Sequence, residues 1–260
     1  MRVARFAEGD ADPRYGILDD DDELVVLKGH PLLHGYEPTG ERVAFEDVRL
    51  LAPVIPSKVV CVGMNYAEHR ADMQFASDAP DRPLFFLKPS TSVVGPGDPI
   101  RIPPVTGRIV HEAELAIVIS RVAKQIRAED WRDYVFGFTI ANDVSARDEM
   151  FEDGQWARAK GFDTFCPIGP WIETDLDPLA GLEIQSYVDG EPRRHGNTAD
   201  MIFGVPAILA AATDIWTLLP GDVVITGTPS GLGGFTSGQR VDIDIEGIGR
   251  LSNPARNRDA

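Results

Sequence analysis

Cysteine is scarce in this sequence: Cys61 and Cys166 are the only two among 260 residues. Two cysteines are too few for a disulfide scaffold, and neither has a second Cys or His near it at the spacing of a zinc site. The sequence therefore indicates a reducing compartment, the cytoplasm, and excludes the disulfide-rich class of small secreted proteins.

Long hydrophobic runs and positive charge are also lacking. No run approaches the roughly 18 apolar residues that a membrane-spanning helix needs. Charges and Pro13 interrupt the N-terminal stretch where a secretory signal has a continuous apolar segment. The chain has 25 Lys and Arg against 41 Asp and Glu, a net charge of −16. This charge repels phosphate backbones and anionic lipid surfaces, so we expect neither nucleic acid nor membrane as a partner.

Glycine and proline, by contrast, are abundant, with 25 and 20 residues, and they divide the chain into short segments. Runs typical of β-strands lie between these breaks, whereas helical patterns are few and short. Strands and helices do not alternate regularly, which favours a β-rich α+β fold over a parallel sheet. The acidic run 19–22 fits a solvated hairpin turn in a small N-terminal β unit. Two prolines near residue 53 separate the predicted domains, 1–52 and 53–260.

The first candidate site lies in residues 110–119, VHEAELAIVI. Alternate side chains of a β-strand share a face, so Glu112 and Glu114 are expected on one otherwise apolar face, with Cα atoms roughly 6.6 Å apart. Two like charges there are costly unless a cation lies between them. Carboxylate oxygens favour a hard ion, Mg²⁺, Mn²⁺ or Ca²⁺, over zinc. The alternative is an exposed edge strand with both glutamates in water.

A third acid, Asp143, follows the apolar run 136–141, where a strand is expected to end. Ligands are common at such strand ends, although Asp143 could instead cap a helix that starts near Ser145. Arg147 in the same turn could clamp a substrate carboxylate through two hydrogen bonds. Its alternative role is a surface ion pair with Asp148 or Glu149.

Two further segments carry candidate catalytic groups. His69 precedes Asp72 by three residues, so a helix would bring the carboxylate to the imidazole and leave the other ring nitrogen to act as a base. Lys160 lies in a glycine-containing turn and could stabilise a developing enolate or carboxylate. An exposed histidine and an exposed turn lysine are the plain alternatives. The glycine-rich turn 226–231 could offer backbone N–H groups to an anion, but it lacks the lysine of a phosphate loop.

Seven segments occur in the order and approximate spacing of the fumarylacetoacetate hydrolase family, and the resemblance begins near Pro56. They are VCVGMNYAEH, PLFFLKPSTSVVGPGDPI, HEAELAIVI, NDVSARD, AKGFDTFCPIGPW, MIF and ITGTPSG. The resemblance implies a mixed β-sandwich roll with a small N-terminal β domain, one Mg²⁺ or Mn²⁺ ion per subunit, and a homodimer.

Carried over position by position, the resemblance implies roles for eight residues. The metal ligands are Glu112, Glu114 and Asp143; the catalytic residues are Lys160 and the pair His69 and Asp72; the substrate contacts are Arg147 and Thr228. The sequence departs from hydrolytic relatives at two positions. Asp72 stands where many of them have Glu in the water-activating pair, and Met150 stands where they often have Gln.

The stretch AKGFDTFCPIGPW most resembles the branch named 2-hydroxyhepta-2,4-diene-1,7-dioate isomerase, with its linked decarboxylase. The resemblance therefore implies an enzyme of aromatic-compound catabolism that acts on 2-oxo or 2-hydroxy-diene dioic acids through a metal-bound enolate. Two alternatives stay open, an acylpyruvate or fumarylpyruvate hydrolase and an oxaloacetate decarboxylase. An alternative of another class is a metal-binding scaffold without catalytic activity.

Overall fold

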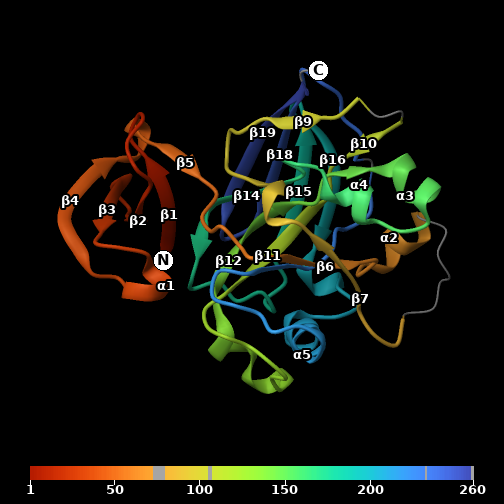
Figure 1. Ribbon diagram of the computed structural model, residues 1–260, viewed down its shortest axis with the longest axis horizontal. Helices are drawn as coiled ribbons and strands as arrows, with labels where there is room; N and C mark the ends of the chain where they lie inside the picture. Colours follow the sequence, from red (N-terminus) through yellow and green to blue (C-terminus); the bar gives the residue numbers. More distant parts are fainter. Residues whose placement is uncertain (73–79, 105–106, 232, 259–260) are drawn as a thin grey trace.

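The computed structural model describes residues 1–72, 80–104, 107–231 and 233–258, with the side chain of Asp72 outside the description. Figure 1 shows a small N-terminal β unit, coloured red to orange, beside a larger body of strands with helices at its periphery. The β-rich α+β fold expected from the sequence is confirmed. Within the described residues, no helix is long and apolar enough to cross a membrane.

The N-terminal unit is a short antiparallel sheet with its own small core. Its elements are β1 (Arg2–Ala7), β2 (Arg14–Leu18), β3 (Glu23–Leu27), α1 (Pro31–His34), β4 (Pro38–Ala44), η1 (Phe45–Asp47) and β5 (Arg49–Leu51). The acidic run 19–22 forms the turn between β2 and β3, where the Asp19 carboxylate accepts two backbone N–H groups. Strand β1 also pairs with the main body, since Arg2 lies opposite Glu173. The predicted division at residues 52 and 53 stays a prediction.

The main sheet continues from β1 in the order β1-β14-β12-β11-β17-β6-β7. Its strands are β6 (Val59–Gly63), β7 (Leu84–Lys88), β11 (Ala113–Ile119), β12 (Val135–Asn142), β14 (Cys166–Glu173) and β17 (Val223–Ile225), with β8 (Val93–Val94) paired to β14. The β6–β17 pair is parallel, whereas β11 is antiparallel to both of its neighbours. The sheet is therefore mixed, and β11 lies at its centre.

A second sheet of five strands packs against the main one. Its order is β16 (Glu191–Asn197), β15 (Glu183–Val188), β18 (Arg240–Ile245), β19 (Gly249–Asn257) and β9 (Ile100–Ile102), and a separate short pair joins β10 (Ile109–Val110) to β13 (Ser145–Ala146). Leu115 and Ile117 of β11 share a core with Ile184 and Ile243 of the second sheet. The two sheets thus form the two layers of a sandwich.

Strand β11 is buried along its whole length because a core forms on each of its faces. Leu115 and Ile117 point into the core between the sheets, whereas Ala116 and Val118 pack into a second core on the opposite face. A strand covered on both faces appears as a continuous apolar run, as residues 115–119 do. Glu114 shares the parity of Ala116 and Val118, so its carboxylate enters an apolar environment.

The helices lie around the sandwich, and three short ones surround one end of β11. The helical elements of the main body are α2 (Ala67–Asp72), η2 (Ser90–Ser92), η3 (Ala128–Tyr134), α3 (Arg147–Asp153), α4 (Ala157–Gly161), η4 (Thr198–Asp200) and α5 (Val205–Ile215). Helices α2, α3 and α4 lie on the same side of the body in Figure 1, and α5 lies away from them. The candidate site lies among the first three.

Candidate active site

The three predicted acidic ligands meet at one end of the β11–β12 pair. Glu112 directly precedes β11, Glu114 is its second residue, and Asp143 directly follows β12. The antiparallel pairing places Ala113 opposite Asn142, which brings these strand ends together. One oxygen from each of the three carboxylates lies within 4.8 Å of the others.

The backbone around Glu112 differs from the expected continuous strand. The chain leaves β10 at Val110 and enters β11 at Ala113, so His111 and Glu112 lie outside both strands. His111 is buried and its ring contacts the carbonyl oxygen of Gly233 at 2.7 Å and Ser186 Oγ at 2.8 Å. The strand breaks because β10 pairs with β13 rather than with a strand of the main sheet.

The electrostatics of Glu114 favour a bound cation. The side chain is buried, and burial together with the charges of Asp143 and Glu112 raises the pKa of its carboxyl well above the usual range. The backbone N–H of Gly227 donates to its Oε2 at 2.6 Å. Three carboxylates this close require a counter-charge, and an all-oxygen donor set suits Mg²⁺ or Mn²⁺. The donor set therefore fits a hard divalent ion, and the edge-strand alternative is wrong for Glu114.

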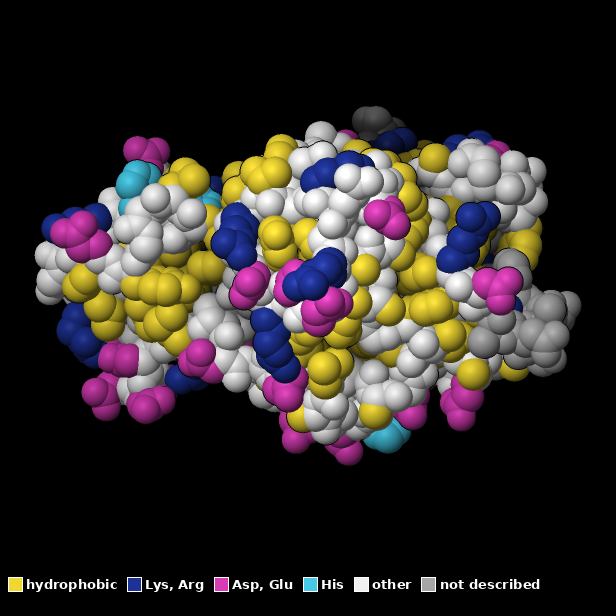
Figure 2. All heavy atoms as spheres, turned by 90° about the horizontal axis from the view of Figure 1, so that it is seen from below, with side chains coloured by type: hydrophobic (Ala, Val, Ile, Leu, Met, Phe, Trp, Pro, Cys, Tyr) yellow, Lys and Arg dark blue, Asp and Glu magenta, His cyan; other side chains and the backbone are white. Residues whose placement is uncertain are grey.

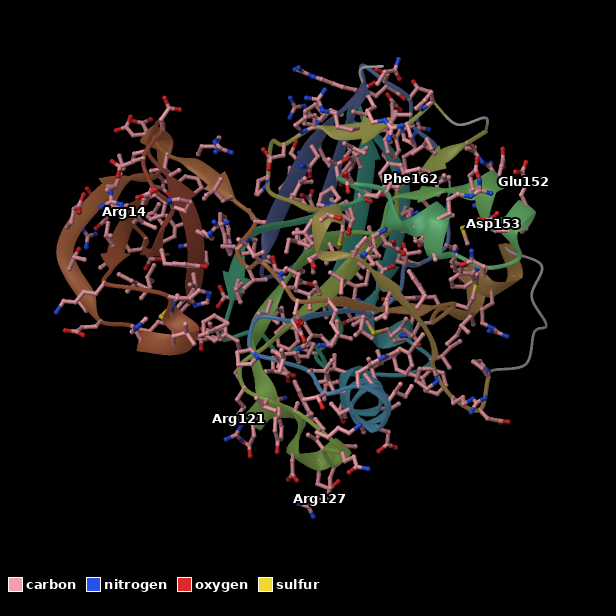
Figure 3. All side chains as sticks on the ribbon, viewed as in Figure 1. Arg14, Arg121, Arg127, Glu152, Asp153 and Phe162 are labelled. Carbon is pink, nitrogen blue, oxygen red and sulfur yellow. The ribbon has the colours of Figure 1, made fainter. Side chains whose placement is uncertain are left out.

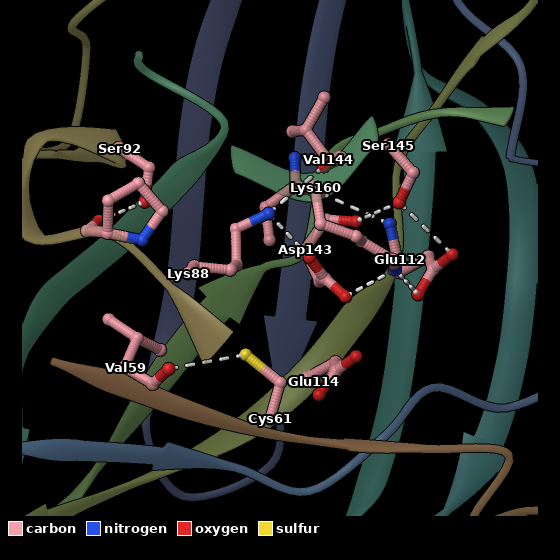
Figure 4. A network of polar contacts seen from close by, with 12 residues as sticks. Val59, Cys61, Lys88, Ser92, Glu112, Glu114, Asp143, Val144, Ser145 and Lys160 are labelled. Carbon is pink, nitrogen blue, oxygen red and sulfur yellow. Dashed lines mark hydrogen bonds and ion pairs between the residues drawn. The ribbon is translucent and has the colours of Figure 1, made fainter. Parts of the chain in front are cut away.

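Two buried lysines contact the acidic cluster (Figure 4). Lys160, from α4, pairs with Asp143 Oδ2 and with Glu112 Oε2, the latter at 2.8 Å. Burial lowers the pKa of Lys160, but the charges of Asp143 and Glu112 outweigh this and raise it above its ordinary value. Lys88, from the end of β7, donates to Asp143 Oδ1 at 2.6 Å and to the Val144 carbonyl oxygen at 3.1 Å. Both lysine side chains therefore lie directly against the carboxylates.

His69 lies in α2 and its side chain is buried at 5% exposure. Burial lowers its pKa to about 4, although the nearby charge of Glu112 acts in the opposite direction. The imidazole is therefore neutral at pH 7, the form that can accept a proton. Among the described residues, its Nδ1 has no hydrogen-bond partner. Asp72 is in the same helix, but its side chain lies outside the described structure, so the His69–Asp72 pair stays a prediction.

A small cavity connects these groups. The described residues that line it come from the acidic cluster, from β6 and β7, from the loops that follow β6 and β17, and from α2, α3 and α4 with its N-cap; they are Val62, Gly63, Met64, His69, Phe86, Glu112, Glu114, Met150, Trp156, Lys160, Gly227 and Thr228. The rings of Phe86 and Trp156 meet edge to face at 5.2 Å, and Lys160 Nζ lies 5.0 Å from the centroid of Phe86. One wall is therefore charged and another apolar.

The glycine-rich turn after β17 has two roles that the sequence did not distinguish. Gly227 adopts φ +94°, and its N–H binds the protein's own Glu114 rather than an external anion. Thr228 is 2% exposed and lines the cavity, and among the described residues its Oγ1 has no hydrogen-bond partner. A buried hydroxyl without a protein partner is suited to receive a substrate oxygen.

Arg147 and Asp143 differ from the alternatives that their sequence positions allowed. Asp143 does not cap α3, whose N-cap is Ala146. Arg147 begins α3 and is not among the described residues that line the cavity, although its charge is close enough to lower the pKa of His69. Met150, at the position where hydrolytic relatives often carry Gln, does line the cavity. The substrate contact of Arg147 stays a prediction.

Sequence reasoning missed Lys88 and Asn65. Lys88 ends the apolar strand LFFLK, and a lysine at the end of such a run was the available signal. Asn65 is buried, and its amide binds the carbonyl oxygens of Phe203 and Thr226 at 3.0 and 2.7 Å while its oxygen accepts from Phe203 N. Through these hydrogen bonds, Asn65 connects the loop after β6 with the turn after β17. Both loops line the cavity, so Asn65 fixes their relative position.

Comparison with known proteins agrees with this architecture. Residues 58–256 match the family model described as fumarylacetoacetate (FAA) hydrolase C-terminal, and residues 1–53 match one described as Rv2993c-like, N-terminal. Oxaloacetate tautomerase fahd2, mitochondrial, of Xenopus laevis is 43% identical in an alignment 288 positions long, which covers 98% of this chain and 90% of that protein.

Solved structures extend the comparison. The crystal structure of 2-hydroxyhepta-2,4-diene-1,7-dioate isomerase from Mycobacterium marinum superimposes on this chain with a TM-score of 0.90. The two sequences are 44% identical, and 100% of both chains is covered. Maleylpyruvate hydrolase from Sphingobium sp. SYK-6, in complex with manganese(II) ion and pyruvate, is 31% identical over 100% of both chains, with a TM-score of 0.80. With its fold, its acidic cluster and these matches, the chain belongs to the fumarylacetoacetate hydrolase family of enzymes.

Proposed function

We propose that the protein is a divalent-metal-dependent enzyme that transfers a proton at the carbon next to the 2-oxo group of dioic acids. The specific activity that we favour is that of a 2-hydroxyhepta-2,4-diene-1,7-dioate isomerase and decarboxylase. The observation that carries this proposal is one cavity that holds a carboxylate cluster, a neutral imidazole and a buried ammonium group. Two proteins compared above are named as an isomerase and a tautomerase, which supports proton transfer.

The acidic cluster supplies the metal site in this proposal. Glu112, Glu114 and Asp143 would hold one Mg²⁺ or Mn²⁺ ion per subunit, since hard ions prefer carboxylate oxygens. Such an ion, when bound, acts as a Lewis acid toward the carboxylate and 2-oxo oxygens of a substrate. That chemistry would make a proton of the substrate easier for His69 to remove.

His69 is the proposed general base. Its pKa of about 4 keeps the imidazole neutral at pH 7, and it opens into the same cavity as the carboxylates. The imidazole would take the proton from the 2-hydroxyl oxygen of the dienol and deliver it to a carbon of the conjugated system, so that an O–H bond breaks, a C–H bond forms and the oxygen becomes the 2-oxo group. Lys160 would stabilise negative charge on the substrate oxygen, and Thr228 Oγ1 would hydrogen-bond the substrate carboxylate.

The apolar wall favours proton transfer over hydrolysis. Phe86, Met150 and Trp156 offer no polar atom that could position an attacking water except the Trp156 ring N–H. Hydrolysis needs a water held and deprotonated against a carbonyl, which depends on the geometry of the base. Asp72 is one methylene shorter than Glu, and a base displaced by about one ångström can cost about 10²-fold in rate. Isomerisation and decarboxylation need no attacking water.

Hydrolysis of an acylpyruvate is the second candidate, since a structural neighbour is named maleylpyruvate hydrolase. Decarboxylation of oxaloacetate is a third outcome of the same chemistry. The homodimer and the cytoplasmic location inferred from the sequence also belong to the proposal. A scaffold without activity is the alternative of another class, and turnover of any substrate excludes it.

The test is a substrate panel measured with purified protein and Mg²⁺. Enol decay is followed by ultraviolet absorbance for 2-hydroxyhepta-2,4-diene-1,7-dioate and the enol of oxaloacetate, and cleavage is followed for an acylpyruvate. We expect kcat/KM to be higher for a dioic acid than for the acylpyruvate, and Asp72→Glu to raise hydrolysis selectively. The proposal is contradicted if the unsubstituted protein cleaves the acylpyruvate with a higher kcat/KM than it shows for any dioic acid.

A further inference from the structure

Lys88 is a buried charge that the proposed reaction does not use. It is the last residue of β7, the edge strand of the main sheet, and its side chain is 1% exposed. Its Nζ donates to Asp143 Oδ1 at 2.6 Å and to the carbonyl oxygen of Val144 at 3.1 Å. A fully buried lysine without a partner would be strongly destabilising, so this ion pair fixes where both side chains lie.

Lys88 and Lys160 contact the same carboxylate from different sides. Lys88 binds Oδ1 of Asp143, whereas Lys160 binds Oδ2 and also reaches Glu112 (Figure 4). Lys160 lines the cavity, but Lys88 is not among the described residues that do. Lys160 can therefore meet a substrate, while Lys88 contacts only the protein.

We propose that Lys88 is a positioning residue of the metal centre. This proposal rests on the proposed function in one respect, the use of Asp143 as a metal ligand. By holding Oδ1, Lys88 directs Oδ2 of Asp143 toward the space shared with Glu112 and Glu114. It also keeps one positive charge next to the cluster whether or not Lys160 stays in contact with it.

The geometry carries this role, because loss of a positive charge beside three carboxylates would by itself strengthen their attraction for a cation. Three carboxylates and two ammonium groups give the cluster a formal charge of −1, which a divalent ion and an anionic substrate can balance. A cation between the carboxylates competes with Lys160, since Lys160 contacts two of them. Lys88 approaches from the opposite oxygen and keeps its contact. Residues that orient a metal ligand in this way typically contribute 10- to 100-fold to metal affinity.

The test measures Mn²⁺ binding by isothermal titration calorimetry in the absence of substrate. We expect Lys88→Met to weaken Mn²⁺ binding by about 10- to 100-fold. The matched control is Lys58→Met, which removes another lysine–aspartate pair, with the buried Asp222, outside the cavity. The control is expected to lower the thermal unfolding temperature and to leave the Kd for Mn²⁺ within about twofold of the parent.

A purely structural role predicts a different result. In that case Lys88→Met would lower thermal stability like the control and bind Mn²⁺ as tightly as the parent, which would overturn the proposal. If Lys88→Met does not fold, Lys88→Gln replaces it, because its amide nitrogen is one bond closer to the backbone than Lys88 Nζ and so loses the 2.6 Å contact with Asp143 Oδ1 while keeping a polar side chain at this position. Unchanged Mn²⁺ affinity in folded Lys88→Gln would then overturn the proposal. Turnover by the parent tests the proposed function separately, because none of these titrations contains substrate.

Discussion

Acidic side chains occupy opposite environments in the N-terminal unit and in the main sheet. In the N-terminal unit none of them is buried, and several pair with arginines, as Glu41 does with Arg14 at 2.7 Å. Figure 2 shows Asp, Glu, Lys and Arg side chains interspersed over one face, and Figure 3 places Arg14 on this unit, far from Glu152 and Asp153 of α3. In the main sheet, Glu114 and Asp143 are buried within an apolar framework.

This difference shows which acids in the sequence are informative. An exposed ion pair contributes about 0–1 kcal/mol to stability, so a run such as residues 19–22 imposes little cost and indicates little chemistry. A buried carboxylate is costly unless it meets a cation or a hydrogen-bond donor, so it persists where it has a use. Substitutions in the two regions should therefore have very different effects.

The largest effect is expected for Glu114→Ala. Removal of this side chain leaves two anions, too few to hold Mg²⁺ firmly against its hydration shell. We expect Mn²⁺ and Mg²⁺ binding to weaken by more than about 100-fold and turnover to disappear. Calorimetry measures the binding. If Glu114→Ala binds either ion as tightly as the parent, the metal assignment is wrong.

The next largest effect is expected for His69→Ala. A general base usually contributes about 10²- to 10⁴-fold to turnover, and His69 is not a proposed metal ligand. We therefore expect kcat to fall by that factor while the Kd for Mn²⁺ stays close to that of the parent. Steady-state kinetics and calorimetry on the same preparation separate the two quantities. Unchanged turnover on the best substrate would refute the role of His69.

A smaller effect on metal affinity is expected from a change of pH. Burial and the charges of Asp143 and Glu112 raise the pKa of Glu114, so below that pKa the metal-free cluster holds a proton that a divalent ion must displace. Protons and metal compete, so affinity falls as pH falls, by about tenfold per pH unit below this pKa. Titrations in buffers of different ionisation enthalpy should show proton release on binding. A Kd that does not change with pH, without proton release, would contradict this mechanism.

The smallest effect is expected for Glu41→Ala in the N-terminal unit. The substitution removes an exposed ion pair with Arg14, so the free energy of unfolding should change by about 0–1 kcal/mol. Mn²⁺ affinity and turnover should match the parent. Chemical denaturation and calorimetry check both statements. A change in metal affinity comparable to that of Glu114→Ala would remove the distinction between the two regions.

Much of the site could be predicted because it depends on local patterns. Glu112, Glu114 and Asp143 stand at the ends of apolar strands, and antiparallel pairing of neighbouring strands brings such ends together. Helix α5, Val205–Ile215, also follows a local pattern, because Pro206 lies in its first turn, where proline suits a helix.

The rest depends on contacts between distant segments, which no local pattern reveals. The break at His111 and Glu112 follows from the pairing of β10 with β13. The burial of Lys88 follows from the position of β7 beside β6, which points this side chain toward Asp143. The use of the Gly227 N–H by Glu114 requires the turn after β17 to lie against β11, more than a hundred residues away in sequence.

The most direct test of the central claim is deuterium exchange at the carbon next to the 2-oxo group of a 2-oxo dioic acid, followed by proton NMR in D₂O. The parent protein with Mg²⁺ should accelerate exchange over Mg²⁺ alone, and both removal of the metal and His69→Ala should abolish most of the acceleration. Exchange no faster than with Mg²⁺ alone, in a preparation that cleaves an acylpyruvate, would contradict proton transfer as the function of this site.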